Sequence, residues 1–333
     1  MPPLTAAAGR HDVLLRKAAS QGAVISRDQA RSFGVSDDEI AAHISADRWQ
    51  AVHPGVYYLS NGSPRRETVV WAALLWAGDG SALGFESAGE RVGLVDPQPV
   101  DSDVVVLVPW ERQVKRRPGV VIRRRRGLIR QVHLGAPPST RVEHTVLDLA
   151  SEASTVRDAV GWVTRSYQRR LTTPDRLMRA LEQRVRIRRR PLLKALAATV
   201  SPHADSALEA EYDRVASRHG LPNAVAQRRE TLPAHRGSEG PGRRRLRRDR
   251  DYKEFNTVVE LDGHLGHDDA WDVFRDMDRD NDTQEMGRAT LRYGYADVFG
   301  RPCGVARQVA VVLQNNGWSG RLRPCGPSCT ALG

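Results

Sequence analysis

Cysteine, long apolar stretches and aromatic residues are all scarce in this chain of 333 residues. Only three cysteines occur, all after residue 300, and this odd number excludes an extended disulfide framework. No window reaches the roughly 18 consecutive apolar residues that a membrane-spanning helix requires. The first ten residues also lack the basic-then-apolar order of a secretory signal. We therefore expect a globular protein in the cytoplasm, without a membrane partner.

The sequence also lacks a P-loop, a dinucleotide fingerprint and a serine elbow, which are the common motifs of nucleotide-binding proteins and hydrolases. Cys325 and Cys329 lie in a segment rich in proline and glycine, which predicts a flexible tail over 321–333. With no second cysteine or histidine pair beside them, a zinc site is expected to lack ligands. Cys303 is expected to pack on the last helix.

Acidic residues are in the minority, and the formal net charge is +11. A basic protein favours polyanionic partners, because cationic side chains neutralise phosphates and release counterions. Three stretches carry much of this charge: 112–130, 179–194 and 228–250. Each could instead be a solvated face. The third stretch supplies the expected DNA contacts of the C-terminal region, which are Arg243, Arg244, Arg245, Arg247 and Arg248.

A strand with two carboxylates follows this third stretch. In the run 258–263, Glu260 and Asp262 are two residues apart, so both point to one face of the strand. If 247–252 is the preceding antiparallel strand, with a turn near 254–255, Asp249 lies opposite Glu260 and Asp251 lies opposite Val258. Opposed carboxylates repel each other unless they share a proton or a divalent cation. The pattern predicts a metal site at Asp249, Glu260 and Asp262. The alternative is an acidic hairpin whose carboxylates pair with arginines.

The same residues resemble the PD-(D/E)XK nuclease fold in its small Vsr-like version, over roughly the last 120 residues. The resemblance assigns Asp249 as the first acid, Glu260 as the second and Glu209 as the acid of an earlier helix. Asp262 stands where the family has lysine, which is a departure from the motif. The resemblance implies Mg²⁺-dependent hydrolysis of a phosphodiester.

Histidine replaces the lysine in Vsr-like relatives, and two histidines follow the acidic strand here. The resemblance therefore implies that His267 is the base, ahead of His264. The catalytic set expected from the resemblance is Glu209, Asp249, Glu260, Asp262 and His267.

The N-terminal region carries a second set of motifs. Two capping boxes, Ser26 to Gln29 and Ser36 to Glu39, predict the starts of two short helices separated by a glycine turn. The run 48–58 then alternates like the two strands of a hairpin. Together these features resemble the winged helix at the start of AbiEi-type antitoxins, whose wing has the same R-W-x-x-V-H-P-G-V-Y pattern.

A winged helix often places its second helix in the major groove of DNA. Here that helix opens with three carboxylates, which repel phosphates, so His43, Ser45 and Arg48 are the expected DNA contacts. Either the wing contributes more than the helix, or the module binds a protein.

These observations predict an α+β protein with a winged helix over 1–62, a mixed α/β and helical middle region over 63–200, a restriction-endonuclease-like α/β domain with a mixed sheet over 201–320, and the tail. We expect a DNA-binding protein with a metal-dependent endonuclease domain, in phage defence or mobile-element biology. The alternative is a non-catalytic, antitoxin-like transcriptional regulator, which could also bind a cognate toxin.

Overall fold

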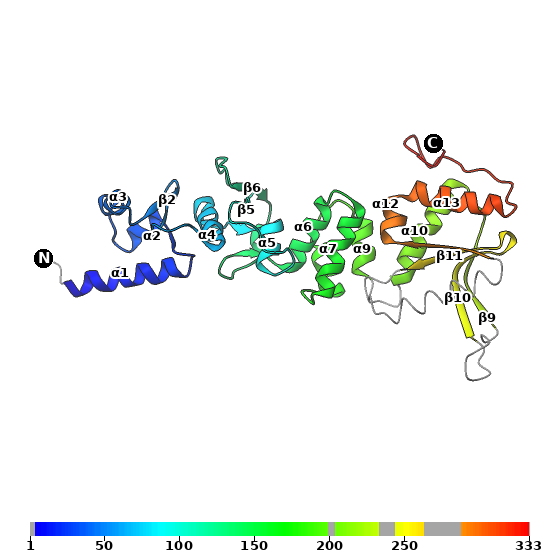
Figure 1. Ribbon diagram of the computed structural model, residues 1–333, viewed down its shortest axis with the longest axis horizontal. Helices are drawn as coiled ribbons and strands as arrows, with labels where there is room; N and C mark the ends of the chain where they lie inside the picture. The colour runs from blue at the N-terminus through cyan, green and yellow to red at the C-terminus, as the bar shows by residue number, and fades with distance from the viewer. Residues whose placement is uncertain (1–3, 199–203, 233–243, 263–287, 333) are drawn as a thin grey trace. The chain divides into compact units, whose positions relative to one another are not determined.

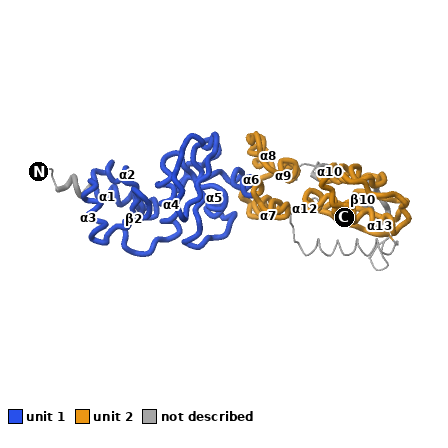
Figure 2. Tube along the Cα trace, turned by 90° about the horizontal axis from the view of Figure 1, so that it is seen from above, with its two compact units in different colours: residues 1–149 blue, residues 150–333 orange. Residues whose placement is uncertain are grey.

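The structure is a computed structural model, and it describes residues 4–198, 204–232, 244–262 and 288–332. The chain divides into two compact units, residues 1–149 and 150–333 (Figure 2). The described residues form helices and three sheets, so the protein has the predicted α+β character. Among them, no helix is both long and apolar enough to cross a membrane.

The first unit begins with a small module of helices and a three-stranded antiparallel sheet of order β1-β3-β2. Its elements are α1 (Leu4–Ala19), β1 (Val24–Ser26), α2 (Arg27–Ser32), α3 (Asp37–Ser45), β2 (Gln50–His53) and β3 (Val56–Tyr58). Both predicted capping boxes are present, and they begin α2 and α3. A small apolar core, in which Leu14, Ile25 and Trp49 are buried, holds the module together.

The rest of the first unit is a five-stranded mixed sheet of order β6-β5-β4-β8-β7 with helices beside it. Its elements are α4 (Arg66–Ala77), β4 (Ala82–Leu83), α5 (Phe85–Arg91), β5 (Val104–Pro109), β6 (Val120–Arg125), a 3₁₀ turn (Leu128–Gln131), β7 (Val132–His133), β8 (Ser139–Thr140) and the first part of α6 (Val142–Glu152), whose last residues belong to the second unit. Val24 and Val56 of the N-terminal module share one core with Trp71 of α4 and Val106 of β5. The module and the mixed sheet therefore pack as one unit.

The second unit starts with short helices, α7 (Val156–Gln168), α8 (Pro174–Glu182) and α9 (Arg190–Ala197). A capping box at Thr155 begins α7, while Thr173 caps α8 and Pro174 occupies its first position. The side chain of Arg189 donates to the carbonyl oxygens of Ala150 and Ala153, where α6 ends.

The C-terminal part of this unit is built on a four-stranded mixed sheet of order β12-β11-β10-β9. Figure 1 labels three of its strands, β9, β10 and β11. Its elements are α10 (Ala204–His219), β9 (Val225–Leu232), β10 (Arg244–Tyr252), β11 (Thr257–Asp262), β12 (Ala289–Gly294), α12 (Tyr295–Gly300) and α13 (Pro302–Asn315). β9, β10 and β11 are antiparallel neighbours, whereas β12 runs parallel to β11. Asp251 pairs with Val258, as predicted, and a 3₁₀ turn over Lys253–Phe255 joins the two strands.

Candidate functional site

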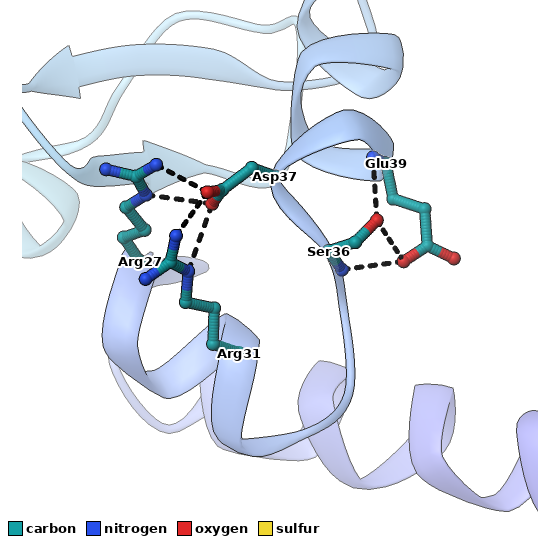
Figure 3. Close-up of polar contacts among 5 residues, drawn as sticks. All are labelled: Arg27, Arg31, Ser36, Asp37 and Glu39. Carbon is teal, nitrogen blue, oxygen red and sulfur yellow. Dashed lines mark hydrogen bonds and ion pairs between the residues drawn. The ribbon is translucent and has the colours of Figure 1, made fainter.

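The acidic start of α3 is organised by side chains of its own module (Figure 3). Arg27 donates to both oxygens of Asp37, at 2.8 Å from Nε and 2.5 Å from Nη2. Arg31 also donates to this carboxylate, 3.1 Å from Nε to Oδ1. These hydrogen bonds hold the pKa of Asp37 well below its usual value. Glu39 accepts from the backbone N–H of Ser36 in the capping box. Two of the three carboxylates in the first turn of α3, those of Asp37 and Glu39 but not that of Asp38, are thus shown with partners in the module.

The three predicted DNA contacts lie at the other end of α3. Arg48 Nε donates to His43 Nδ1 over 3.1 Å, and the imidazole stacks on buried Trp49 with ring centroids 4.3 Å apart. Burial, followed by the charge of Arg48, lowers the pKa of His43. Ser45 and Arg48 are exposed. The structure therefore brings these polar groups to one end of the helix.

A hydrogen bond joins the hairpin to the basic segment 112–130. Arg117 Nε donates to Nδ1 of His53, at the end of β2, over 3.0 Å. Burial and the positive charge of Arg117 together lower the pKa of His53. A surface cavity of about 820 Å³ lies beside this contact and is lined by Arg116, Arg117 and Arg124, together with Asp103 and apolar residues of β6. The hairpin and the basic segment therefore lie next to each other within the first unit.

An exposed tryptophan in the same region was not among the predicted site residues. Trp110 follows β5 and is 41% exposed. The guanidinium carbons of Arg124 and Arg126 lie 4.8 and 4.7 Å from the centre of its ring. The sequence signal was the arginine run 123–126, in which Arg124 belongs to β6 and Arg126 lies just beyond its end.

In the second unit, Asp249 and Glu260 come from adjacent strands. The register observed for Asp251 and Val258 places Asp249 opposite Glu260, as the sequence predicts. Asp249 Oδ2 accepts from the backbone N–H of Leu261 over 2.8 Å. Glu260 accepts from Arg292 of β12, 3.1 Å away. Asp262 is exposed at the end of β11.

Glu209 has a different environment from the carboxylates with which it was grouped. Its Oε2 accepts from Arg250 Nη1 over 3.1 Å, and the same guanidinium binds Asp213 at 2.6 Å. Arg250 thus faces α10, and residues next to each other on a strand point to opposite faces. Although burial acts against it, hydrogen bonds to Asp213 and Glu209 raise the pKa of Arg250. The structure therefore pairs Glu209 with Arg250 on the α10 side of the sheet.

Several predicted site residues lie outside the described part of the chain. These are His264, His267 and Arg243. Arg244, Arg245, Arg247 and Arg248 belong to β10 and pair with β9 through the backbone, but the positions of their side chains are outside the description. Among the residues that the structure describes, the predicted carboxylates do not form a cluster of three or more ligand atoms close enough for one ion.

One such cluster does occur among the described residues, and it is formed by His219, Cys303, Cys325 and Cys329. One potential ligand atom from each lies within 4.8 Å of the others. The expectation that Cys325 and Cys329 lack further ligands was wrong, because the fold supplies the partners from α10 and α13. The available signal was the three-residue gap between the two cysteines, which fits the spacing of zinc ligands.

Comparisons with known proteins leave the family of this chain open. No family model matches the sequence, and no curated protein matches it. The crystal structure of the Rv2827c protein from Mycobacterium tuberculosis is similar with a TM-score of 0.37 and 17% identity, covering 68% of this chain and 88% of that one. A likeness of this extent assigns neither a fold nor a function.

Proposed function

We propose that this protein binds DNA through its first unit. The observation that carries the proposal is the hydrogen bond between His53 and Arg117, because it joins the hairpin to the arginine-rich segment 112–130 of that unit. In this proposal the module 1–62 is a winged helix of the AbiEi type, with α3 as its second helix and β2 and β3 as its wing.

Charge supports this assignment. The carboxylate of Asp37 is balanced by two arginines, and the side chains of Arg27 and Arg31 remain about half exposed, at 49% and 52%. The objection that acidic residues at the start of α3 repel phosphates is therefore weakened. Arg116, Arg117 and Arg124 add positive charge beside the wing, where they can bind a phosphate backbone.

Fluorescence anisotropy with a labelled DNA duplex at several salt concentrations tests the proposal. Replacing Arg116, Arg117 and Arg124 with alanine is expected to weaken binding. If each arginine neutralises one phosphate, the slope of log K against log salt should become shallower by about 2.7. Arg214→Ala is the control, because Arg214 is an exposed arginine in the second unit that pairs with Glu211. Unchanged affinity and slope in the triple variant would contradict the proposal.

Hydrolysis of DNA is a second candidate function, in which the C-terminal region has the Vsr-like nuclease fold. It is favoured by the opposed carboxylates of Asp249 and Glu260 and by the mixed sheet that carries them. Their oxygens suit Mg²⁺, which is often held by one or two carboxylates together with substrate phosphates. When bound, the ion would lower the pKa of a water ligand and neutralise charge on the phosphate. Asp262 extends the same acidic face, and His267 remains the proposed base.

The arginine pairs favour the non-catalytic alternative. Arg292 binds Glu260, and Arg250 binds Glu209, so two of the proposed catalytic carboxylates are ion-paired. In this version the protein is an antitoxin-like regulator that binds DNA, and a cognate toxin if one exists. The C-terminal region then contributes a binding surface.

A plasmid-nicking assay with and without Mg²⁺ separates the two candidates. An active enzyme should nick DNA only with Mg²⁺, and Glu260→Ala should reduce the rate by roughly 100-fold or more. Glu254→Ala is the matched control, since Glu254 is an exposed glutamate in the turn before β11. Wild-type protein that binds the plasmid but does not nick it would support the regulator.

A further inference from the structure

Three distant parts of the second unit meet at the cluster of His219, Cys303, Cys325 and Cys329. His219 is the last residue of α10, and Cys303 lies in the first turn of α13. Cys325 and Cys329 belong to the segment that follows α13. His219 and Cys329 are 110 positions apart in the sequence, yet His219 Nε2 lies 3.6 Å from Cys329 Sγ.

The distances match those of a tetrahedral zinc site. Zn–S bonds of about 2.3 Å and Zn–N bonds of about 2.0 to 2.1 Å, at tetrahedral angles, separate two sulfurs by about 3.8 Å and a sulfur from a nitrogen by about 3.5 Å. Cys303 Sγ lies 3.7 Å from Cys325 Sγ and 3.8 Å from Cys329 Sγ. A disulfide requires sulfurs about 2.05 Å apart, so the three cysteines are free thiols.

The histidine is oriented as a zinc ligand. His219 Nδ1 lies 2.8 Å from the carbonyl oxygen of Val215. A carbonyl oxygen only accepts, so Nδ1 carries the proton and donates it. In the neutral ring Nε2 then has a lone pair, and this is the nitrogen that faces the cysteines. A second hydrogen bond of this kind accompanies metal-binding histidines and fixes their tautomer.

The segment that carries Cys325 and Cys329 is held against α10 by further contacts. Arg323 donates its backbone N–H to the carbonyl oxygen of His219 over 2.8 Å. Ala331 is buried, and His219 is only 1% exposed. Cys325 is exposed, so a metal could enter from solvent. The sequence-based expectation of a flexible tail at 321–333 therefore contrasts with an arrangement in which this segment contacts two helices.

We infer that His219, Cys303, Cys325 and Cys329 form a structural zinc site that fastens the C-terminal segment to α10 and α13. Four protein ligands close the coordination sphere, which is typical of structural rather than catalytic zinc. Mg²⁺ does not suit these ligands, since it prefers oxygen. The site is therefore separate in place and chemistry from the carboxylates of β10 and β11, and it is independent of the proposed function.

Metal analysis of the full-length, tag-free protein tests the inference directly. Elemental mass spectrometry should find about one zinc ion per chain after purification under reducing conditions. Exchange with Co²⁺ should give the visible absorption of a tetrahedral thiolate site. The inference is overturned if the wild-type protein contains no zinc and does not bind Co²⁺ while its thiols are reduced.

Variants then identify the ligands. Cys329→Ser and His219→Asn should each lose most of the bound zinc, whereas Ser328→Ala and His133→Asn, at neighbouring and remote exposed positions, should retain it. Treating the wild-type protein with a chelator should lower its melting temperature, and the same treatment should not change that of Cys329→Ser. Zinc content that is unchanged in both ligand variants would overturn the assignment. Because the wild-type metal content is measured independently, a variant that fails to fold leaves the inference testable.

Discussion

The two units use arginine and carboxylate groups in opposite arrangements. In the first unit, one carboxylate, Asp37, binds the two arginines Arg27 and Arg31 at the protein surface. In the second, one arginine, Arg250, binds the two carboxylates Glu209 and Asp213, and its side chain is only 5% exposed. Solvent weakens the first arrangement, but in the second it is largely excluded from Arg250 and Glu209 and reaches only Asp213.

This difference separates two roles for an ion pair. At the surface, the pairs with Asp37 fix how α2 meets the start of α3, and they leave cationic side chains available to a polyanion. In the interior, Arg250 has already lost its hydration, so its partners must compensate for that cost. Removing one partner should therefore have a much larger effect on stability in the second unit than in the first.

The largest effect is expected for Arg250→Met. This change leaves Glu209 buried without its arginine and should lower the free energy of unfolding of the second unit by about 3 to 5 kcal/mol. Urea denaturation monitored by circular dichroism measures this change in the free energy of unfolding. Arg214→Met is the control, because that arginine forms an exposed pair with Glu211 on the same helix.

The double variant Arg250→Met with Glu209→Leu sharpens this test. If the cost of Arg250→Met comes from the buried charge of Glu209 losing its arginine, removing that charge should restore part of the lost stability. Asp213 is about half exposed and can be solvated. A double variant that is less stable than Arg250→Met alone would show that packing, not charge, dominates at this position.

A smaller effect is expected for Ser36→Ala in the first unit. The Ser36 hydroxyl accepts the N–H of Glu39 at the start of α3. Its loss should destabilise the first unit by about 1 kcal/mol, as for other N-cap residues. Thermal unfolding measures the change, and Ser63→Ala, in an exposed loop, is the control. Equal midpoint temperatures of unfolding for Ser36→Ala and Ser63→Ala would contradict a stabilising cap.

The parts of the structure that the sequence predicted correctly follow from local rules. Capping boxes join residues three positions apart, and the hairpin register depends on alternation and a short turn. The opposition of Asp251 and Val258 could therefore be predicted before any tertiary contact was known. The α+β character follows from the same local patterns.

The contacts that sequence analysis missed depend on how helices pack. Glu209 was grouped with Asp249 through a family resemblance, but its position depends on which face of the sheet α10 covers, and Arg250 points to that face. The cysteine cluster joins residues 22, 26 and 110 positions apart. No rule of local spacing connects such positions, so only the C-x₃-C pair was visible in advance.

The smallest expected effect in this comparison is a loss of stability of the first unit at acidic pH. Hydrogen bonds from Arg27 and Arg31 lower the pKa of Asp37 below its ordinary value of about 3.9. The folded state therefore binds fewer protons at Asp37 than the unfolded state just below that value. The stabilisation is fully present above about pH 4 and is lost as the pH falls further.

Melting temperatures between pH 5 and 2.5 should show a shallower acid-induced decline for Asp37→Asn than for the wild type. Asp38→Asn is the control for removing one charge from the same exposed turn. Parallel profiles for Asp37→Asn and the wild type would mean that the surface pairs add nothing to stability, and their role would then be confined to positioning cationic groups for a partner.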